Sequence, residues 1–193
     1  VGIEIKGKVV TGGGYLYFDK DRGEYFGLVH LNIKNKIHVK AIGIIQTRMP
    51  DGKAGYSFLL LISVEFPPKP IGMGFSLTGV GGLIGIQRSI DSKKLTAGIY
   101  DSSLDDFLFP ENPIRNVYSL VNKINAFFPP ADDQYTFGIT AKLFWGPNKI
   151  VVIKLGLIME FPDPVRMAII GVLRADVAKK IGGRNFSVLR LRV

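Results

Sequence analysis

The chain has 193 residues, 47% of them hydrophobic, and this length suffices to bury about 70% of the unfolded surface in one or two compact units. It carries a net charge of +9 and no cysteine, which excludes disulfides, thiol catalysis and thiolate metal sites. Its longest hydrophobic stretches run for about a dozen residues, short of the roughly 20 that a membrane-spanning helix needs. The sequence therefore predicts no transmembrane segment and leaves the cellular location open.

The positive charge is spread along the chain rather than gathered in a basic block. Between Asp91 and Asp133 acids outnumber bases, and elsewhere lysines and arginines alternate with apolar residues, as in "EIKGKVV" and "KNKIHVK". Such alternation is typical of the solvated face of a sheet. Nucleic acid or another polyanion is therefore disfavoured as a partner, although the net charge keeps that hypothesis open, together with an enzyme of unrecognised type.

The first 88 residues show a period of two, which predicts β-strands. The stretch 2–10 alternates apolar and charged residues, and the runs 12–18 and 24–33 flank the turn "DKDRG" as a hairpin. Two longer strands are expected at 36–47 and 56–66. The second of these, "YSFLLLISVEF", is apolar on both faces and predicts a strand that is covered on both sides.

After Arg88 the period changes, and residues 89–128 are predicted to form a helical insert. Ser89 and Asp91 can cap its start, and Asn112 followed by Pro113 can cap a later helix that Pro129 ends. One face of that later helix carries Ile114, Val117, Leu120, Val121 and Ile124.

Strand patterns resume at 134–146, 150–161, 165–177 and 186–193. The fold class predicted is mainly β (α+β): an antiparallel, curved sheet of about eight to nine strands with the insert at 89–128. Residues 1–193 are expected to form a single β-rich module. Because the chain begins without methionine and ends on the strand-like "SVLRLRV", we expect a piece excised from a longer chain, although processing of a precursor would look the same.

A short internal echo occurs twice. Glu65-Phe66-Pro67 and Glu160-Phe161-Pro162 each follow an apolar run and precede a further proline. Proline lacks an N–H and ends a ladder of backbone hydrogen bonds. The echo suggests two similar sheet halves around the insert, although chance could supply so short a match.

The glycine-rich stretch "GFSLTGVGGLIGIQR" (74–88) fits no nucleotide-binding fingerprint. Ile84 stands where G-x-G-x-x-G needs its third glycine, and no Gly-Lys-Ser/Thr follows for a Walker loop. Gly72 and Gly74 predict a strand with a thin face, because glycine lets another backbone or side chain approach closely. The later residues predict a structural hinge where the sheet gives way to helices. The hinge residues are Gly79, Gly81, Gly82, Gly85 and Arg88.

The same stretch carries a resemblance. "GFSLTGVGGLIGIQRSID", followed by "DSSLDDFLFPENP", "INAFFPP", "FGITAKLFWG" and "IMEFPDPVRMAIIGVLRA", resembles an uncharacterised family of large bacterial and fungal proteins that carry a domain of unknown function. Its members show a Gly-Phe-x-Leu-x-Gly-x-Gly-Gly-Leu-x-Gly run. The resemblance covers the chain from about Gly14 to Ala175. It implies a module inside a much longer polypeptide and supplies no catalytic residues.

Constellations that could carry chemistry are scarce. His30 and His38 have no carboxylate at ligand spacing, and "DKDRGE" departs from a calcium loop at the positions that need glycine and glutamate. Asp105 and Asp106 fall in the first turn of a predicted helix, where negative charge is favourable in any case. The sequence therefore predicts no catalytic residue, no cofactor and no metal.

Two functions fit these observations best. The first is a non-enzymatic structural or interaction module that neighbouring domains of the same polypeptide or other protein subunits continue at its open ends. The second is a carrier of a hydrophobic ligand or lipid, in which Phe75, Leu77, Phe127 and Phe128 border an apolar groove of the sheet. Core packing is the competing explanation for these apolar residues.

Overall fold

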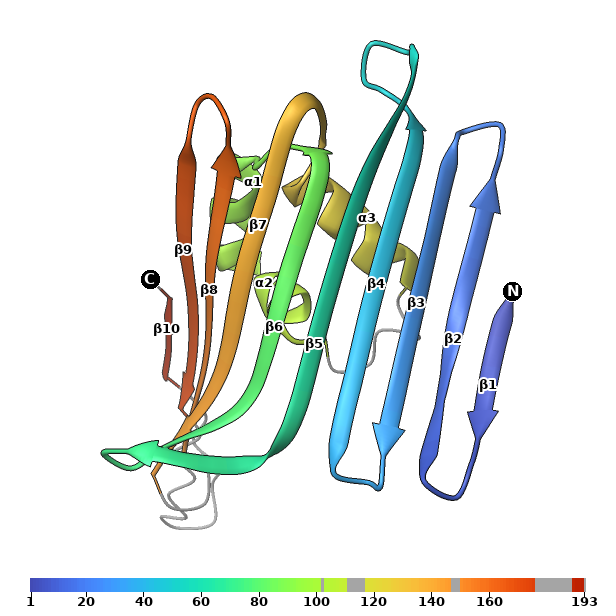
Figure 1. Ribbon diagram of the computed structural model, residues 1–193. Coiled ribbons are helices and arrows are strands. Elements are labelled where there is room, and N and C mark those ends of the chain that lie inside the picture. The colour runs from blue at the N-terminus through green and yellow to red at the C-terminus, as the bar shows by residue number, and fades with distance from the viewer. Residues whose placement is uncertain (102, 111–116, 147–149, 176–188, 193) are drawn as a thin grey trace.

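A computed structural model describes the whole chain except residues 102, 111–116, 147–149, 176–188 and 193 (Figure 1). In the described part, ten antiparallel strands form one sheet whose order follows the order of the chain. The strands are β1 (Gly2–Lys6), β2 (Val10–Asp19), β3 (Glu24–Ile33), β4 (Ile37–Arg48), β5 (Ala54–Gly72), β6 (Phe75–Arg88), β7 (Pro130–Trp145), β8 (Val151–Phe161), β9 (Arg166–Ala175) and β10 (Leu189–Arg192). Each strand therefore pairs only with its neighbours in the sequence.

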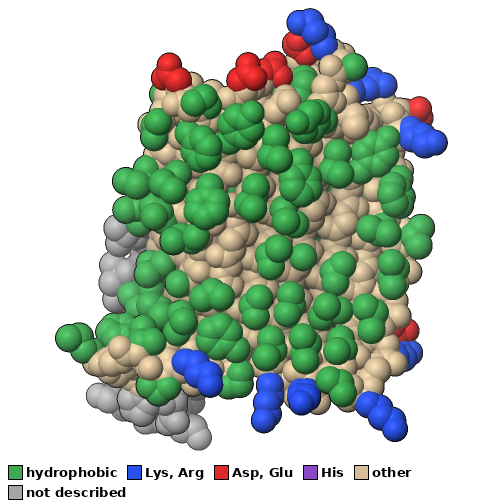
Figure 2. All heavy atoms as spheres, viewed as in Figure 1, with side chains coloured by type: hydrophobic (Ala, Val, Ile, Leu, Met, Phe, Trp, Pro, Cys, Tyr) green, Lys and Arg blue, Asp and Glu red, His purple; other side chains and the backbone are tan. Residues whose placement is uncertain are grey.

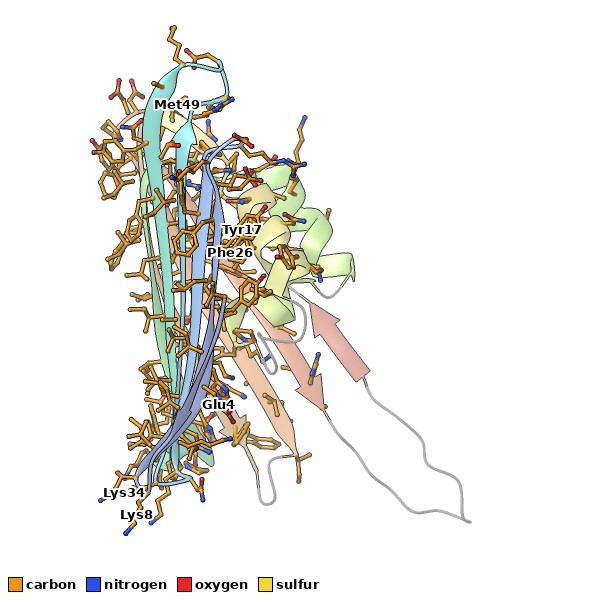
Figure 3. All side chains as sticks on the ribbon, turned by 90° about the vertical axis from the view of Figure 1, so that its right-hand side faces the viewer. Glu4, Lys8, Tyr17, Phe26, Lys34 and Met49 are labelled. Atoms are coloured by element: carbon orange, nitrogen blue, oxygen red, sulfur yellow. The ribbon has the colours of Figure 1, made fainter. Side chains whose placement is uncertain are left out.

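Between β6 and β7 lie the described helices α1 (Ser92–Asp101), α2 (Ser103–Leu108) and α3 (Val117–Phe127). All three pack on the same face of the sheet (Figures 1 and 3). The prediction of a mainly β, antiparallel fold with a helical insert is confirmed, and the four-residue β10 brings the strands to ten. None of the described helices is long and apolar enough to cross a membrane.

The core lies between the sheet and the helices. Leu28, Ile42, Leu61 and Leu83 pair across β3 to β6 as one buried row. The predicted apolar face of α3 packs over this layer, since Val117, Leu120, Val121 and Ile124 are buried. The start of that helix, with Ile114 and the expected cap at Asn112 and Pro113, lies outside the described residues.

An aromatic cluster holds α3 over β2 and β3. The rings of Tyr17 and Phe26 stack with centroids 4.7 Å apart and point toward the helices (Figure 3). Tyr118 on α3 meets Phe26 edge to face at 5.6 Å, and its hydroxyl hydrogen bonds to that of Tyr15 at 2.6 Å. Such pairs contribute about 0.5–1.5 kcal/mol each beyond the area they bury.

The glycines of the predicted hinge lie inside β6, so the hinge interpretation of these residues is wrong. Gly79, Gly81 and Gly85 face the helices, and a Cβ at Gly81 would lie 2.4 Å from Thr140 Oγ1. They make the strand thin there, while the chain leaves the sheet only after Arg88, the last residue of β6. Positive φ angles occur instead at Gly72 and Gly74, in the β5–β6 turn where a thin strand was expected.

Gly82, the remaining glycine of the predicted hinge, also lies within β6. It pairs with Ile62 on β5 and with Ile139 on β7. By strand alternation Gly82 faces away from the helices, onto the open side of the sheet. The space that Gly79, Gly81 and Gly85 leave free of side chains is on the helix side.

The two echoed glutamates anchor opposite parts of the helical layer. Glu160 is buried and accepts hydrogen bonds from Ser89 Oγ (3.0 Å) and the Ile90 backbone N–H (2.9 Å), just before α1. Glu65 pairs with Lys40 (2.7 Å), whose Nζ also donates to the Pro110 carbonyl after α2. The sheet is continuous, so the echo marks these two anchors rather than two sheet halves.

Candidate functional site: an open apolar face

The face of the sheet opposite the helices has no covering element among the described residues (Figures 1 and 3). Four rows of residues cross it from strand to strand, and we call these rows the open apolar face. Their members are Leu31, Val39, Val64, Val80, Ala141, Leu155 and Gly171; Val29, Ala41, Ile62, Gly82, Ile139, Leu157 and Ile169; Gly27, Gly43, Leu60, Ile84, Phe137, Met159 and Met167; and Tyr25, Ile45, Phe58, Ile86, Tyr135 and Phe161. No row contains a charged residue.

Strand alternation places these side chains outward. Along β5, Leu59 and Leu61 are buried under the helices while Ile62 is 39% exposed. The prediction that the strand at 56–66 is covered on both sides is therefore wrong for the described structure, because its second face is open. Exposure reaches 51% at Ile139 and 74% at Ile169. Figure 2 shows the face covered by hydrophobic side chains, with charged side chains at its borders.

The amount of exposed apolar surface is unusual. Most of the large apolar side chains of this face are about two-fifths exposed or more. Since a free aliphatic side chain carries about 100 Å² of apolar surface and an aromatic one more, the exposed apolar area is on the order of 1,000 Å². Monomeric soluble proteins rarely expose apolar patches of more than a few hundred Å², and larger ones mark interaction sites.

The exposed face is more apolar than the buried one. Polar and charged side chains are buried on the helix side, among them Lys40, Ser57, Thr136, Lys154 and Glu160. On the open apolar face the only side-chain polar atoms are the hydroxyls of two tyrosines, in the row nearest one end. The face can therefore offer apolar contact but almost no hydrogen bonds to whatever covers it.

Two shallow hollows interrupt this face. One, of about 210 Å³, lies where Gly27 and Gly43 pair across β3 and β4, and its lining includes Phe18, Ile45 and Phe58. The other, of about 300 Å³, has a lining that includes Ile139, Ala141, Leu155, Leu157 and Ile169. The walls of both are almost wholly apolar, so the hollows fit hydrocarbon and not a polar group.

The two ends of the face differ in charge. The turns β1–β2, β3–β4 and β5–β6 form one end, here called the basic end, which Figure 2 shows as the lower border. Its charged residues in the described chain are Lys6, Lys8, Lys34, Lys36 and Lys69, with Glu4 paired to Lys6. At the opposite end, here called the acidic end, carboxylates outnumber bases. The carboxylates at this end are those of Asp19, Asp21, Glu24, Asp51, Asp132, Asp133 and Asp163. The bases there are Lys20, Arg22, Arg48, Lys53 and Arg166.

The four residues predicted to border a groove are not brought together. Phe75 and Leu77 begin β6, where the Phe75 ring lies 6.4 Å from that of Trp145. Phe127 and Phe128 are buried near the other end of β6, since Arg88 donates to the Phe128 carbonyl at 2.9 Å. Both phenylalanines pack in the core, so the open apolar face lies elsewhere. Its signal in the sequence was the run of apolar residues on both faces of a strand.

Among the described residues, a cluster of histidine, lysine and glutamate side chains lies on the helix side of the sheet. The rings of His30 and His38 stack at 6.4 Å, and burial together with the charge of Lys40 lowers the pKa of His30. Burial by itself would raise the pKa of Glu65, but hydrogen bonds from Lys142 and Lys40 outweigh it and hold that pKa below its ordinary value. Among the described residues no three His, Asp or Glu side chains converge as a metal site would need.

A hollow of about 340 Å³ with both polar and apolar walls lies beside this cluster. Its lining includes Lys36, His38, Glu65, Thr78 and Lys142. The carboxylate of Glu65 already accepts from two lysines, and Thr78 Oγ1 donates to the Lys142 carbonyl at 3.1 Å. These groups therefore bond to one another, and the geometry does not pair a nucleophile with a base.

Comparison with known proteins gives one match. The model of a family of unknown function (DUF6603) matches residues 1–193, the whole chain. No curated protein and no solved structure matches it.

Proposed function

The chain belongs to the DUF6603 family of unknown function, and we propose that it is a non-enzymatic structural or interaction module that works through its open apolar face. A second apolar layer of protein packs against this face and removes it from water. The observation that carries the proposal is the set of four uncharged rows that cross the sheet from β3 to β8 or β9.

The composition of the face favours permanent packing over a transient encounter. Transient interfaces are about as polar as the rest of a protein surface and carry about one hydrogen bond per 100–200 Å². Obligate interfaces are more hydrophobic and resemble a core cut in half. Because the open apolar face has only two tyrosine hydroxyls near one end, it supports the second kind. Two sheets that pack face to face lie about 10 Å apart, with side chains filling the layer between them.

A second candidate is a hydrophobic ligand, such as the acyl chain of a lipid. The two apolar hollows favour it, because the glycine pair Gly27 and Gly43 removes side chains from the centre of the first one. Both hollows are shallow depressions in a broad surface, whereas ligand pockets bury 70–90% of a small molecule. Packing against protein therefore fits the whole face, and ligand binding fits only parts of it.

Charge placed on the face tests the proposal. In the 193-residue chain, the double substitution Ile62→Lys and Ile139→Lys should lower the fluorescence of a bound apolar dye and the self-association seen by light scattering, by about threefold or more. The free energy of unfolding should change by less than about 1 kcal/mol, because both side chains point outward.

The matched control is Val165→Lys. Val165 is 75% exposed in the β8–β9 turn, outside the open apolar face, so this variant should keep both signals. A wild-type chain that stays monomeric at high concentration and binds no apolar dye would refute the proposal. Lipid found by mass spectrometry in organic extracts of the purified chain would favour the second candidate instead.

A further inference from the structure

The charges at the ends of the open apolar face carry an inference about what covers it. We propose that the occupant is a second copy of this chain, packed face to face and turned end for end, so that the basic end of each copy lies over the acidic end of the other. This inference rests on the proposed function, because it names the partner of the same face.

The area of the face is sufficient for a stable dimer. A specific interface buries about 800 Å² on each partner. The open apolar face offers on the order of 1,000 Å², so two copies can pack on each other even when a small part of the surface stays uncovered. A pair related by a two-fold axis uses the same surface on both partners, which suits a face without charges.

The end charges select one orientation of the two copies. If the two-fold axis runs along the strands, the basic end of one copy meets the basic end of the other, which brings Lys8, Lys34 and Lys36 of both copies to the same end of the assembly. If the axis runs across the strands, the basic end meets the acidic end, where seven carboxylates lie against five bases. Like charges across an interface are costly and opposite charges fix its register. The second arrangement is therefore the one that the charges favour.

Each copy then contributes two layers, a sheet and its helices, to a four-layered assembly. The two sheets form the inner layers, and the helices α1 to α3 of each copy lie on the outside, where they already cover the other face (Figure 3). Aligned sheets pack with mean strand directions within about 30° of each other. The sheet is twisted (Figure 3), and such twist is the general cause of this angle.

Cross-linking measures the orientation directly, because the chain has no cysteine of its own. Lys34→Cys places a thiol at the basic end and Asp21→Cys at the acidic end, both at exposed turn positions. A flexible bis-maleimide should give several-fold more cross-linked dimer in an equimolar mixture of the two variants than in either variant alone. Sedimentation equilibrium of the wild-type chain should show a dimer.

Reversal of charge supplies a second readout. Lys34→Glu together with Lys36→Glu should weaken the dimer by about fivefold to tenfold at low salt and by less at high salt, because exposed charges are screened. Lys93→Glu is the control, since this exposed lysine is on α1, on the other side of the sheet, and its reversal should leave dimerisation unchanged.

The outcomes separate this inference from the proposed function. Stronger cross-linking within each variant than in the mixture would overturn the orientation. The wild-type chain could instead be a monomer that binds apolar dye and loses the dye on Ile62→Lys and Ile139→Lys. That result would overturn the second copy as occupant but would still support the open apolar face as an interaction surface. A monomer that binds lipid would overturn it in favour of the ligand. A monomer that binds neither dye nor lipid would refute both proposals.

Discussion

Gly85 on β6 pairs with Thr136 on β7 and lies close to the side chain of Arg88, the last residue of β6. A Cβ built at this position would lie 2.0 Å from Thr136 Oγ1 and 2.9 Å from Arg88 Cβ. Distances that short do not occur between real atoms, so a side chain here must push β7 or Arg88 away. The absence of a side chain at Gly85 is thus what allows Thr136 to lie beside it in the buried layer.

We therefore expect Gly85→Ala to lower the free energy of unfolding by about 2 to 4 kcal/mol in urea denaturation. The matched control is Gly43→Ala on the open apolar face, where a Cβ would meet nothing within 4 Å. That variant should be neutral or stabilising by up to about 1 kcal/mol, since alanine restricts the unfolded chain. Equal losses for both variants would contradict the steric explanation.

Arg88 shows how a single buried side chain joins two elements. It is fully buried, and its Nη1 donates to Asn125 Oδ1 on α3 at 2.8 Å and to the Phe128 carbonyl at 2.9 Å. Burial lowers the pKa of Arg88 to about 10, so the guanidinium stays charged at neutral pH. The end of β6 is thereby fixed to the end of α3.

At the level of the elements, ion pairs on the helix side join strands of the sheet, and one of their lysines also bonds to the helical insert. Glu65 on β5 accepts from Lys40 on β4 and from Lys142 on β7, and so joins two strands that are not adjacent. Lys40 is buried and also donates to the carbonyl of Pro110, beyond the end of α2. Loss of the carboxylate would leave a buried lysine without its charge partner, a change that is far more costly than loss of a surface pair.

Glu65→Gln should lower the free energy of unfolding at pH 7 by about 2 to 3 kcal/mol. The pKa of Glu65 is lower in the folded than in the unfolded chain, so the carboxylate stabilises the fold above its unfolded pKa and loses this effect as pH falls through its folded pKa. The difference in the free energy of unfolding between wild type and variant should therefore narrow as pH falls below about 4.3, the ordinary pKa of a glutamate, toward the lower pKa of the folded chain. Chemical denaturation at several pH values measures the gap.

Glu4→Gln serves as the control for that series. Glu4 pairs with Lys6 at 2.9 Å, but both side chains are exposed. Its removal should change the unfolding curve little at any pH. A gap for Glu65→Gln that stays constant down to pH 3 would show that the carboxylate does not act through its charge.

The elements were largely predictable because their periodicity was clear. Alternation gave the strands, and the spacing of Leu120, Val121 and Ile124 gave the buried face of α3. The hinge prediction was wrong because a glycine in the sequence indicates either a turn or a close approach of a neighbouring strand or side chain. Only the backbone angles distinguish the two. Those of Gly72 and Gly74 have positive φ, whereas the glycines of β6 are extended.

On the scale of the whole molecule, the sheet is protected unevenly. The strands β5, β6 and β7 are paired on both sides and lie beneath the helices (Figure 1). At one edge of the described sheet, β1 pairs only with β2, and all five of its residues are exposed. Local opening should therefore be easiest at this edge.

Hydrogen exchange followed by mass spectrometry should show this gradient. Amides of β6 around Leu83 should exchange at least about a thousandfold more slowly than those of β1 around Glu4. A dimer formed through the open apolar face would leave this order unchanged, because amide hydrogen bonds within the sheet are the same in both states. Equal rates in β1 and β6 would contradict the gradient.

The candidate site could not be located from the sequence, because its exposure depends on how the whole molecule is assembled. A strand that is apolar on both faces indicates that both faces are to be removed from water. It does not indicate whether a helix of the same chain or a partner covers each face. Phe127 and Phe128 were predicted to border a groove and are buried in the core, while Ile62, in the strand predicted to be covered on both sides, is 39% exposed. Only the position of the helices relative to the sheet decides between these cases.

The strand order has a consequence for how such a protein can grow. Because no strand crosses over another, one additional hairpin at an edge would widen the sheet by two strands and leave every existing pairing in place. Each added hairpin would also lengthen all four rows of the outward face by two residues. Duplication of short gene segments could therefore enlarge the binding area stepwise, with no need to redesign what is already folded.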